Sequence, residues 1–215
     1  LTSRNQHVMA QIFTIHPVNP QPRLVSQVVA ILRAGGVVIY PTDSCYALGC
    51  HIGDKTAMER LRAIRSLDVK HHFTLLCRDL SDISTYAHVE NAVYRILRAI
   101  TPGPYTFILP ATREVPRRLQ HPKRKTIGIR IPDHIIAQAL LSELNEPMLT
   151  TSLILPNEAF PATDPDEMKE KLGHSVDAIV DGGPGGLEET SVVDFADHFP
   201  IVIRQGKGDT SRFSG

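Results

Sequence analysis

Small hydroxyl, carboxylate and arginine side chains recur where the apolar segments of this 215-residue chain end. Hydroxyl and guanidinium groups suit phosphate and carboxylate oxygens, and arginine presents a rigid planar fork to them. Each residue alone is an ordinary turn or cap residue. Their recurrence favours a ligand site at the strand ends of an α/β sheet, where loops converge on a crevice. The set is Thr42, Asp43, Ser44, Thr106, Arg130, Thr150, Thr151, Ser152, Thr190 and Ser191.

Other kinds of site lack their sequence signals. Neither G-x-G-x-x-G nor G-x-x-x-x-G-K-[ST] occurs between a strand and a helix pattern, which argues against a dinucleotide-binding or P-loop enzyme. Cys45, Cys50 and His51 do not have the spacing of zinc ligands, so we expect no structural metal. Cys45 as a nucleophile would need a base from elsewhere in the fold.

The formal net charge of zero conceals two oppositely charged segments. Residues 113–130 carry seven basic residues and one acid (seven minus one, +6), whereas residues 157–199 carry eleven acids and two lysines (−9). Clustered cations favour an anionic partner such as RNA, although the two segments could instead neutralise each other. Because only Tyr105 and Phe107 lie nearby, we expect contact with the backbone of duplex or folded RNA. The candidate RNA-binding residues are Arg113, Arg117, Arg118, Lys123, Arg124 and Lys125.

Strand-like and helix-like hydrophobic patterns alternate along the chain. Helices are predicted over residues 24–32, 57–64, 92–100 and 135–144 and after Asp164-Pro165, and residues 78–91 are predicted to form a polar loop. Because helices separate some strands and short loops join others, we expect an α/β fold with a mixed parallel and antiparallel sheet. The predicted strands cover residues 11–15, 37–40, 73–77, 105–109, 126–131, 177–180, 191–195 and 201–204.

Length and cysteine content indicate the class of protein and its compartment. A chain of 215 residues can form one domain. No run approaches the roughly 18 apolar residues of a membrane helix, so no membrane partner is expected. Three cysteines, an odd number in a chain of this size, favour the reducing cytoplasm.

Five segments, in this order and at these distances, resemble the YrdC/YciO family: YPTDSCYALGC, PGPYTFIL, IGIRIPDH, LTTSL and TSVVDF. FTLLCRDLSDISTY, VPRRL followed by KRKTIGIR, and EPMLTTSL are most similar to the YciO branch. The resemblance implies a single YrdC-like domain over residues 9–208, with a twisted sheet and helices around a concave basic cavity. Residues 1–8 would be an upstream extension and residues 209–215 a tail, in a monomer or weak homodimer.

The resemblance also implies ligands. Family members bind nucleotide and RNA, and the YrdC branch makes threonylcarbamoyl-AMP and pyrophosphate from threonine, bicarbonate and Mg-ATP for tRNA modification. Carried over by position, Thr42 would contact the amino acid, and Arg130 would face an anionic group. Thr151, Ser152 and Ser191 would line the pocket.

Two positions depart from the synthase pattern. Synthases have K-x-R and S-x-N where this chain has Arg65-Ser66-Leu67 and Ser152-Leu153-Ile154. Arg65 keeps a charge, but Leu67 lacks the guanidinium and Ile154 lacks the amide. Without one hydrogen bond to a charged phosphate, binding or catalysis is weaker by about 1.5 to 3 kcal/mol.

We therefore expect a cytoplasmic protein that binds RNA (double-stranded RNA or tRNA) and nucleotide, with synthase activity weak or lost. One alternative is an active threonylcarbamoyl-AMP synthase that uses ATP with Mg²⁺, in which Lys70 or His72 compensates for the two departures. The other is a protein-interaction module whose pocket is inert.

Overall fold

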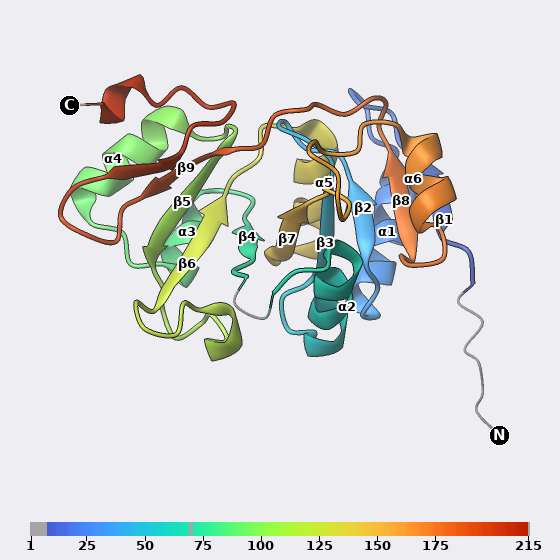
Figure 1. The fold of residues 1–215 in the computed structure, drawn as a ribbon, viewed down its shortest axis with the longest axis horizontal. Coiled ribbons are helices and arrows are strands. Elements are labelled where there is room, and N and C mark those ends of the chain that lie inside the picture. The colour runs from blue at the N-terminus through green and yellow to red at the C-terminus, as the bar shows by residue number, and fades with distance from the viewer. Residues whose placement is uncertain (1–7, 69–70, 215) are drawn as a thin grey trace.

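The computed structural model describes residues 8–68 and 71–214. Within these ranges ten strands form one sheet, in the order β1-β8-β2-β3-β7-β4-β6-β5-β9-β10, which runs along the length of the molecule (Figure 1). Neighbouring strands are parallel in some pairs and antiparallel in others, so the predicted mixed sheet is confirmed. The strands are β1 Gln11–Thr14, β2 Val38–Tyr40, β3 Ala47–His51, β4 Thr74–Leu76, β5 Tyr105–Pro110, β6 Thr126–Arg130, β7 Met148–Ser152, β8 Ala178–Asp181, β9 Ser191–Asp194 and β10 Ile201–Arg204.

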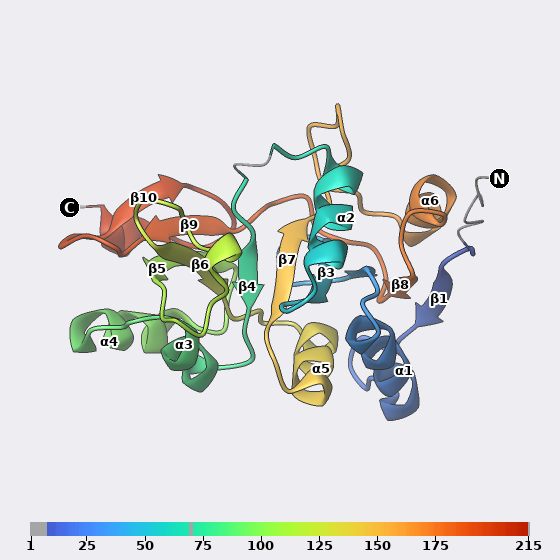
Figure 2. The ribbon, with the colours of Figure 1, turned by 90° about the horizontal axis from the view of Figure 1, so that it is seen from below.

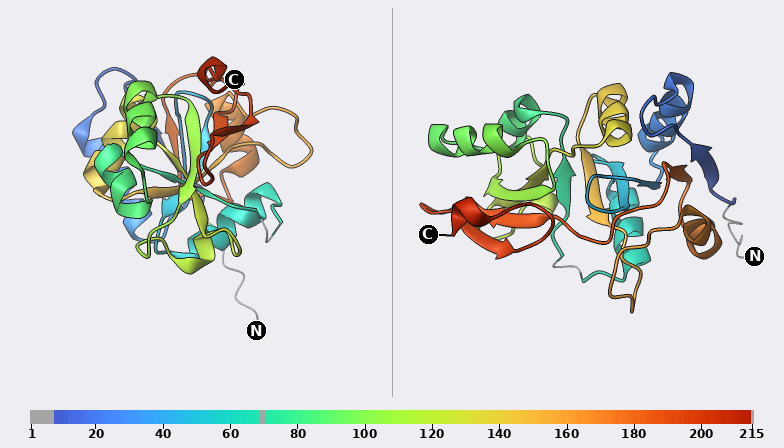
Figure 3. Two further views of the ribbon diagram at one scale, coloured as in Figure 1. Left: turned by 90° about the vertical axis from the view of Figure 1, so that its left-hand side faces the viewer. Right: turned by 90° about the horizontal axis from the view of Figure 1, so that it is seen from above.

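Helices cover both faces of the sheet. Four of them, α1, α3, α4 and α5, lie along one face, and α2 and α6 lie along the other (Figures 2 and 3). One buried apolar cluster joins α1 and α5 to the sheet, and a second, larger cluster includes the buried side chains of α2 and α6. The helices are α1 Pro22–Arg33, α2 Lys55–Arg65, α3 Leu80–Tyr86, α4 Asn91–Ile100, α5 Ile135–Leu144 and α6 Pro165–Leu172, with short 3₁₀ helices at Arg117–Leu119 and Ser211–Phe213.

Predicted helix starts follow their capping residues. Asp54 accepts a hydrogen bond from the Ala57 N–H at 2.8 Å, and Asp164 accepts one from the Asp166 N–H at 2.9 Å. Gly35, with φ of 88°, adopts the left-handed conformation after α1. The prediction of these two helix starts and of the end of α1 is therefore confirmed.

Three elements were not predicted as they occur. The strand β3 contains Gly49 and small side chains directly after a turn-like segment, and β7 ends in two threonines and a serine, so neither shows an alternating apolar pattern. Residues 78–91, predicted as a loop, contain α3, which has one buried residue, Ile83, and therefore little helical periodicity. Of the predicted extension at residues 1–8, only Val8 lies within the described residues.

Candidate anion-binding site

A cavity of about 270 Å³ lies over strands β7, β4, β6 and β5, where the pleat turns alternate side chains to the same side. Thr150 is opposite Thr74 across the sheet, Thr74 is opposite Gly128, and Gly128 is opposite Ile108. A Cβ at Gly128 would lie 3.1 Å from Thr74 Oγ1, so glycine at this position avoids a close contact and leaves space above the sheet. The hydroxyl side chains that line the cavity are Thr74, Thr106, Thr126, Thr150, Thr151, Ser152 and Thr190.

The charged residues of the lining are mostly basic. Glu189 is the one acid among the described residues that line the cavity. The cavity therefore combines hydroxyl groups with a strong excess of cationic donors, which is the arrangement that an anion requires. The basic lining residues are Arg65, Arg124, Arg130 and Arg204, with His71, His72 and His121.

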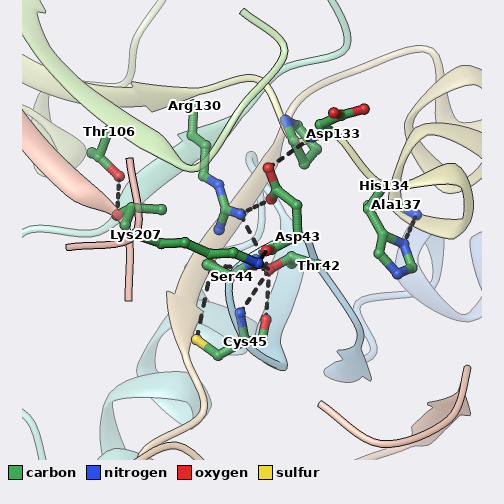
Figure 4. A network of polar contacts seen from close by, with 12 residues as sticks. Thr42, Asp43, Ser44, Cys45, Thr106, Arg130, Asp133, His134, Ala137 and Lys207 are labelled. Atoms are coloured by element: carbon green, nitrogen blue, oxygen red, sulfur yellow. Dashed lines mark hydrogen bonds and ion pairs between the residues drawn. The ribbon is translucent and has the colours of Figure 1, made fainter. Parts of the chain in front are cut away.

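Arg130, the last residue of β6, carries the central guanidinium of this lining and is 5% exposed. Its Nη2 donates to Thr42 Oγ1 at 3.2 Å and to the Asp43 carboxylate, as Figure 4 shows. Asp43 also accepts the Asp133 N–H at 3.0 Å. Among the described residues, Arg130 Nε is the one buried side-chain nitrogen or oxygen without a hydrogen-bond partner. That nitrogen has less than 1 Å² of accessible surface, so no ligand atom reaches it in this conformation, but Arg130 is one of the residues that line the cavity.

The turn that joins β2 to β3 positions Arg130. Thr42 Oγ1 donates to the Cys45 carbonyl at 2.6 Å and accepts the Ser44 N–H at 3.2 Å, so this hydroxyl organises the turn. Thr42 and Asp43 are absent from the described lining of the cavity; they hold the guanidinium that is part of it. Burial raises the pKa of the Cys45 thiol, so it stays protonated at neutral pH.

The other predicted residues also fall into two groups: some line the cavity, and others hold the structure around it. Arg65, at the end of α2, donates to Thr151 Oγ1 at 2.6 Å and to the Ile154 carbonyl at 3.1 Å. Arg65, Thr106, Thr151 and Ser152 line the cavity. Ser191 is fully buried and has a structural role: its Oγ donates to the Gly208 carbonyl at 2.5 Å and anchors the C-terminal segment.

Several site residues were missed in the sequence. Arg204 of β10 donates through Nε to the Thr190 carbonyl at 2.9 Å and through Nη1 to Glu189 at 3.3 Å. Thr190 belongs to the predicted set, and its Oγ1 lies 2.8 Å from Thr106 Oγ1. Lys207 reaches from the C-terminal segment to the Asp43 carbonyl oxygen at 2.5 Å (Figure 4). Arg204 could have been found from the sequence, because it is a charged residue in the otherwise apolar run IVIR. No sequence pattern pointed to Lys207.

Residues 30–206 match the Sua5/YciO/YrdC family model, which carries the description "Telomere recombination". The chain belongs to this family. It is 56% identical over 205 residues to the uncharacterized protein YciO of Escherichia coli (strain K12), which covers 95% of this chain and 100% of that protein. The crystal structure of E. coli YciO has a TM-score of 0.92 to this fold and covers 95% of this chain and 100% of that chain.

A threonylcarbamoyl-AMP synthase of Halorhodospira halophila (strain DSM 244 / SL1) is 32% identical over 192 residues, which cover 89% of this chain and 94% of that protein. Identity to the YciO protein is therefore well above identity to this synthase. The predicted membership of the Sua5/YciO/YrdC family and the greater likeness to YciO are confirmed.

The two departures from the synthase pattern of the Sua5/YciO/YrdC family have definite places in the fold. Leu67, directly after the left-handed cap residue Ser66, packs against the larger buried cluster. Ile154 offers its carbonyl to Arg65. Neither side chain is among the described residues that line the cavity. Of the two residues considered as compensation, Lys70 lies outside the described residues, and His72 lines the cavity.

The predicted RNA-binding residues lie in the loop between β5 and β6, residues 111–125, called here the basic loop. Arg124 lines the cavity and pairs with Asp194 through hydrogen bonds of 2.7 and 3.2 Å, so the two charged segments neutralise each other there. Arg118 Nη2 donates to the Ile52 carbonyl at 3.1 Å. The remaining four are exposed and form no ion pair within the described ranges: Arg113, Arg117, Lys123 and Lys125.

Within residues 8–68 and 71–214, no group of three or more His, Cys, Asp and Glu side chains is placed to hold a metal ion. No helix there has the length and apolarity needed to cross a bilayer.

Proposed function

We propose that this protein binds a nucleotide in its central cavity and RNA through its basic loop, with synthase activity weak or lost. The observation that carries the nucleotide proposal is a cavity lined by seven hydroxyl side chains and by four guanidinium groups, those of Arg65, Arg124, Arg130 and Arg204. Phosphate oxygens accept charge-assisted hydrogen bonds from guanidinium groups, so phosphate is the ligand group that best suits this lining.

The size of the cavity separates the two ligands. Ligand pockets span roughly 300 to 1,000 Å³. The cavity, at about 270 Å³, lies just below this range, so it admits at most one nucleotide and excludes an RNA helix. Folded RNA would instead meet the exposed cations of the basic loop, which neutralise phosphates without reading sequence. If the nucleotide is ATP with Mg²⁺, the one carboxylate among the described lining residues that could meet that ion is Glu189, which already accepts from Arg204 Nη1 at 3.3 Å.

Calorimetric titration with ATP, AMP and adenosine tests the nucleotide proposal. Arg130→Lys keeps a positive charge but removes the fork, so ATP affinity should fall about tenfold or more. Arg95→Lys, on the exposed surface of α4, is the matched control and should leave ATP affinity unchanged. Adenosine lacks phosphate, so it should bind both variants with the same affinity. Absence of ATP binding to the unaltered protein, or equal ATP affinity in both variants, would contradict the proposal.

An active threonylcarbamoyl-AMP synthase is the second candidate, because the H. halophila synthase is 32% identical. Incubation with ATP, Mg²⁺, threonine and bicarbonate decides this question: pyrophosphate above a control without threonine supports a synthase. If the protein is silent, the double variant Leu67→Arg with Ile154→Asn tests whether the two departures explain the silence. ATP affinity equal to or higher than that of the unaltered protein would show that the double variant still folds.

A further inference from the structure

A second hollow, of about 430 Å³, adjoins the central cavity; we call it the side pocket. The two share four lining residues, so they meet along one wall. Within the described residues, the lining of the side pocket contains basic side chains and no acidic one. The shared wall consists of His71, His72, Phe73 and His121, and the side pocket adds Arg62, Arg117, Arg118, Leu119, Gln120 and Pro122.

Two guanidiniums of the side pocket are held in place. Arg62 Nη1 donates to the Asp68 carbonyl at 2.7 Å, and the Arg62 guanidinium lies 5.0 Å from the centre of the Phe73 ring. The Arg62 Nε lies 3.7 Å from Glu59 on the exposed surface of α2. Arg118 is fixed by the Ile52 carbonyl. Arg117, in contrast, is exposed and has no ion-pair partner in the described chain, so it is available to an anion.

The shared wall presents imidazole side chains. His121 Nδ1 accepts the backbone N–H groups of Lys123 and Arg124 at 3.2 and 3.1 Å, which leaves its ring proton on Nε2. The His72 and His121 rings are 4.9 Å apart. Burial and nearby cations lower the pKa of His72, and they lower that of His71 to about 4. An anion at this wall would meet the Nε2–H donor of His121 and would offset the charges of Arg65 and Arg62 that oppose protonation of His71.

The hollows continue beyond the side pocket. A third, of about 390 Å³, shares Arg117 and Gln120 with the side pocket and is also lined by Arg113 and Lys125. No acidic residue of the described chain lines it either. The central cavity, the side pocket and this loop hollow therefore form a series of adjoining basic hollows that ends on the basic loop. Adjoining hollows lined by cations match the successive phosphates of one strand.

We propose that the side pocket is a second phosphate subsite, and that the series of hollows takes the unpaired end of an RNA strand. The terminal nucleotide would occupy the central cavity, the next phosphodiester the side pocket, and the following phosphates the basic loop. The proposal rests on nucleotide binding in the central cavity, and it adds that the bound nucleotide can be the end of an RNA.

Two RNA hairpins with the same stem, one blunt and one with a four-nucleotide overhang, test this proposal by fluorescence anisotropy at one fixed salt concentration. The overhang should raise affinity about tenfold or more, since it adds charge-assisted contacts in two hollows. Saturating ATP should remove this gain by filling the central cavity, and it should leave binding of the blunt hairpin unchanged.

Variants of side-pocket residues distinguish the contribution of the side pocket to RNA binding from that of the central cavity. Arg62→Met keeps an apolar stem over Phe73 and should reduce the gain from the overhang while ATP affinity stays the same. Arg117→Ala, at an exposed residue, cannot disturb packing and should reduce the same gain if Arg62→Met fails to fold. Arg95→Ala is the control. Equal affinity for both hairpins, or a gain that ATP does not compete away, would overturn the subsite; in both cases measured ATP binding would leave the proposed nucleotide function standing.

Discussion

The protein holds its positive charge in two different ways. In the central cavity, Arg130 is 5% exposed and is fixed by Asp43 and Thr42. In the basic loop, Arg113, Arg117, Lys123 and Lys125 are exposed and unpaired within the described residues. A guanidinium that has lost its water interacts strongly with whatever faces it, whereas exposed cations are screened by salt.

This difference assigns different tasks to the two regions. The buried guanidinium is aimed in one direction, so it can select a ligand by geometry, and the fold depends on its carboxylate partner. The exposed cations can attract any polyanion, and each can be removed at little cost to folding. Perturbing one region should therefore change stability and selectivity, and perturbing the other should change the salt dependence of binding.

The largest effect is expected from Asp43→Ala, which removes the carboxylate from the buried pair with Arg130. Breaking such a pair costs about 3 to 5 kcal/mol, because the remaining charge stays buried without compensation. The Asp133 N–H would lose its acceptor as well. The free energy of unfolding, from urea titration, should fall by this amount.

Two matched variants make the Asp43→Ala result interpretable. Asp43→Asn retains one acceptor oxygen, which can serve either Arg130 or the Asp133 N–H but not both, so it should lose less stability than Asp43→Ala. Glu59→Ala removes an acid whose side chain is 53% exposed and 3.7 Å from Arg62, and it should cost at most about 1 kcal/mol. If Asp43→Ala were no worse than Glu59→Ala, the contrast between buried and exposed charge would fail.

The sequence predicts the fold well where burial produces a simple pattern. Strands such as β2, β4 and β8 are short apolar runs and were predicted close to their observed positions. The strand β7 was missed because Thr150 and Thr151 look like turn residues, although in the sheet they contribute hydroxyls to a cavity. A run of polar residues does not reveal that it forms a strand until the neighbouring strands of the sheet are known.

The candidate site was predicted in part for the same reason. Arg130 and Thr106 belong to recognisable motifs, and both line the cavity. Arg204 and Glu189 were missed because their place depends on the pairing of β9 with β10 and of β5 with β9. Register between distant strands is set by the whole sheet, and local propensity carries little information about it.

The basic loop should show an intermediate effect, visible in the salt dependence of RNA binding. Arg113→Ala with Lys123→Ala removes two exposed charges without a described ion-pair partner. The slope of log K against log salt should become shallower by roughly 0.7 to 0.9 for each phosphate that the variant no longer neutralises. ATP affinity should stay the same, since neither residue lines the central cavity. An unchanged slope would place the RNA-binding surface elsewhere on the molecule.

At neutral pH the smallest effect is expected from His71, which belongs to both regions because it lines the central cavity and the side pocket. Burial, followed by the charges of Arg65 and Arg62, lowers its pKa from 6.5 to about 4. Between these values the unfolded chain binds more protons than the folded one, so stability should fall as the pH drops from about 6.5 toward about 4. His71→Gln should make this fall in melting temperature shallower.

Bound nucleotide should reverse part of this behaviour. Phosphate groups in the central cavity would offset the guanidinium charges that oppose protonation of His71, and its pKa would rise back toward the ordinary value. The pH dependence of the unaltered protein should therefore approach that of His71→Gln when ATP is saturating. His88→Gln, at an exposed residue of the loop after α3, should leave both curves unchanged. If ATP left the difference between the unaltered protein and His71→Gln intact, the phosphates would lie too far from this wall to sense it, and the cavity and the side pocket would act as separate sites.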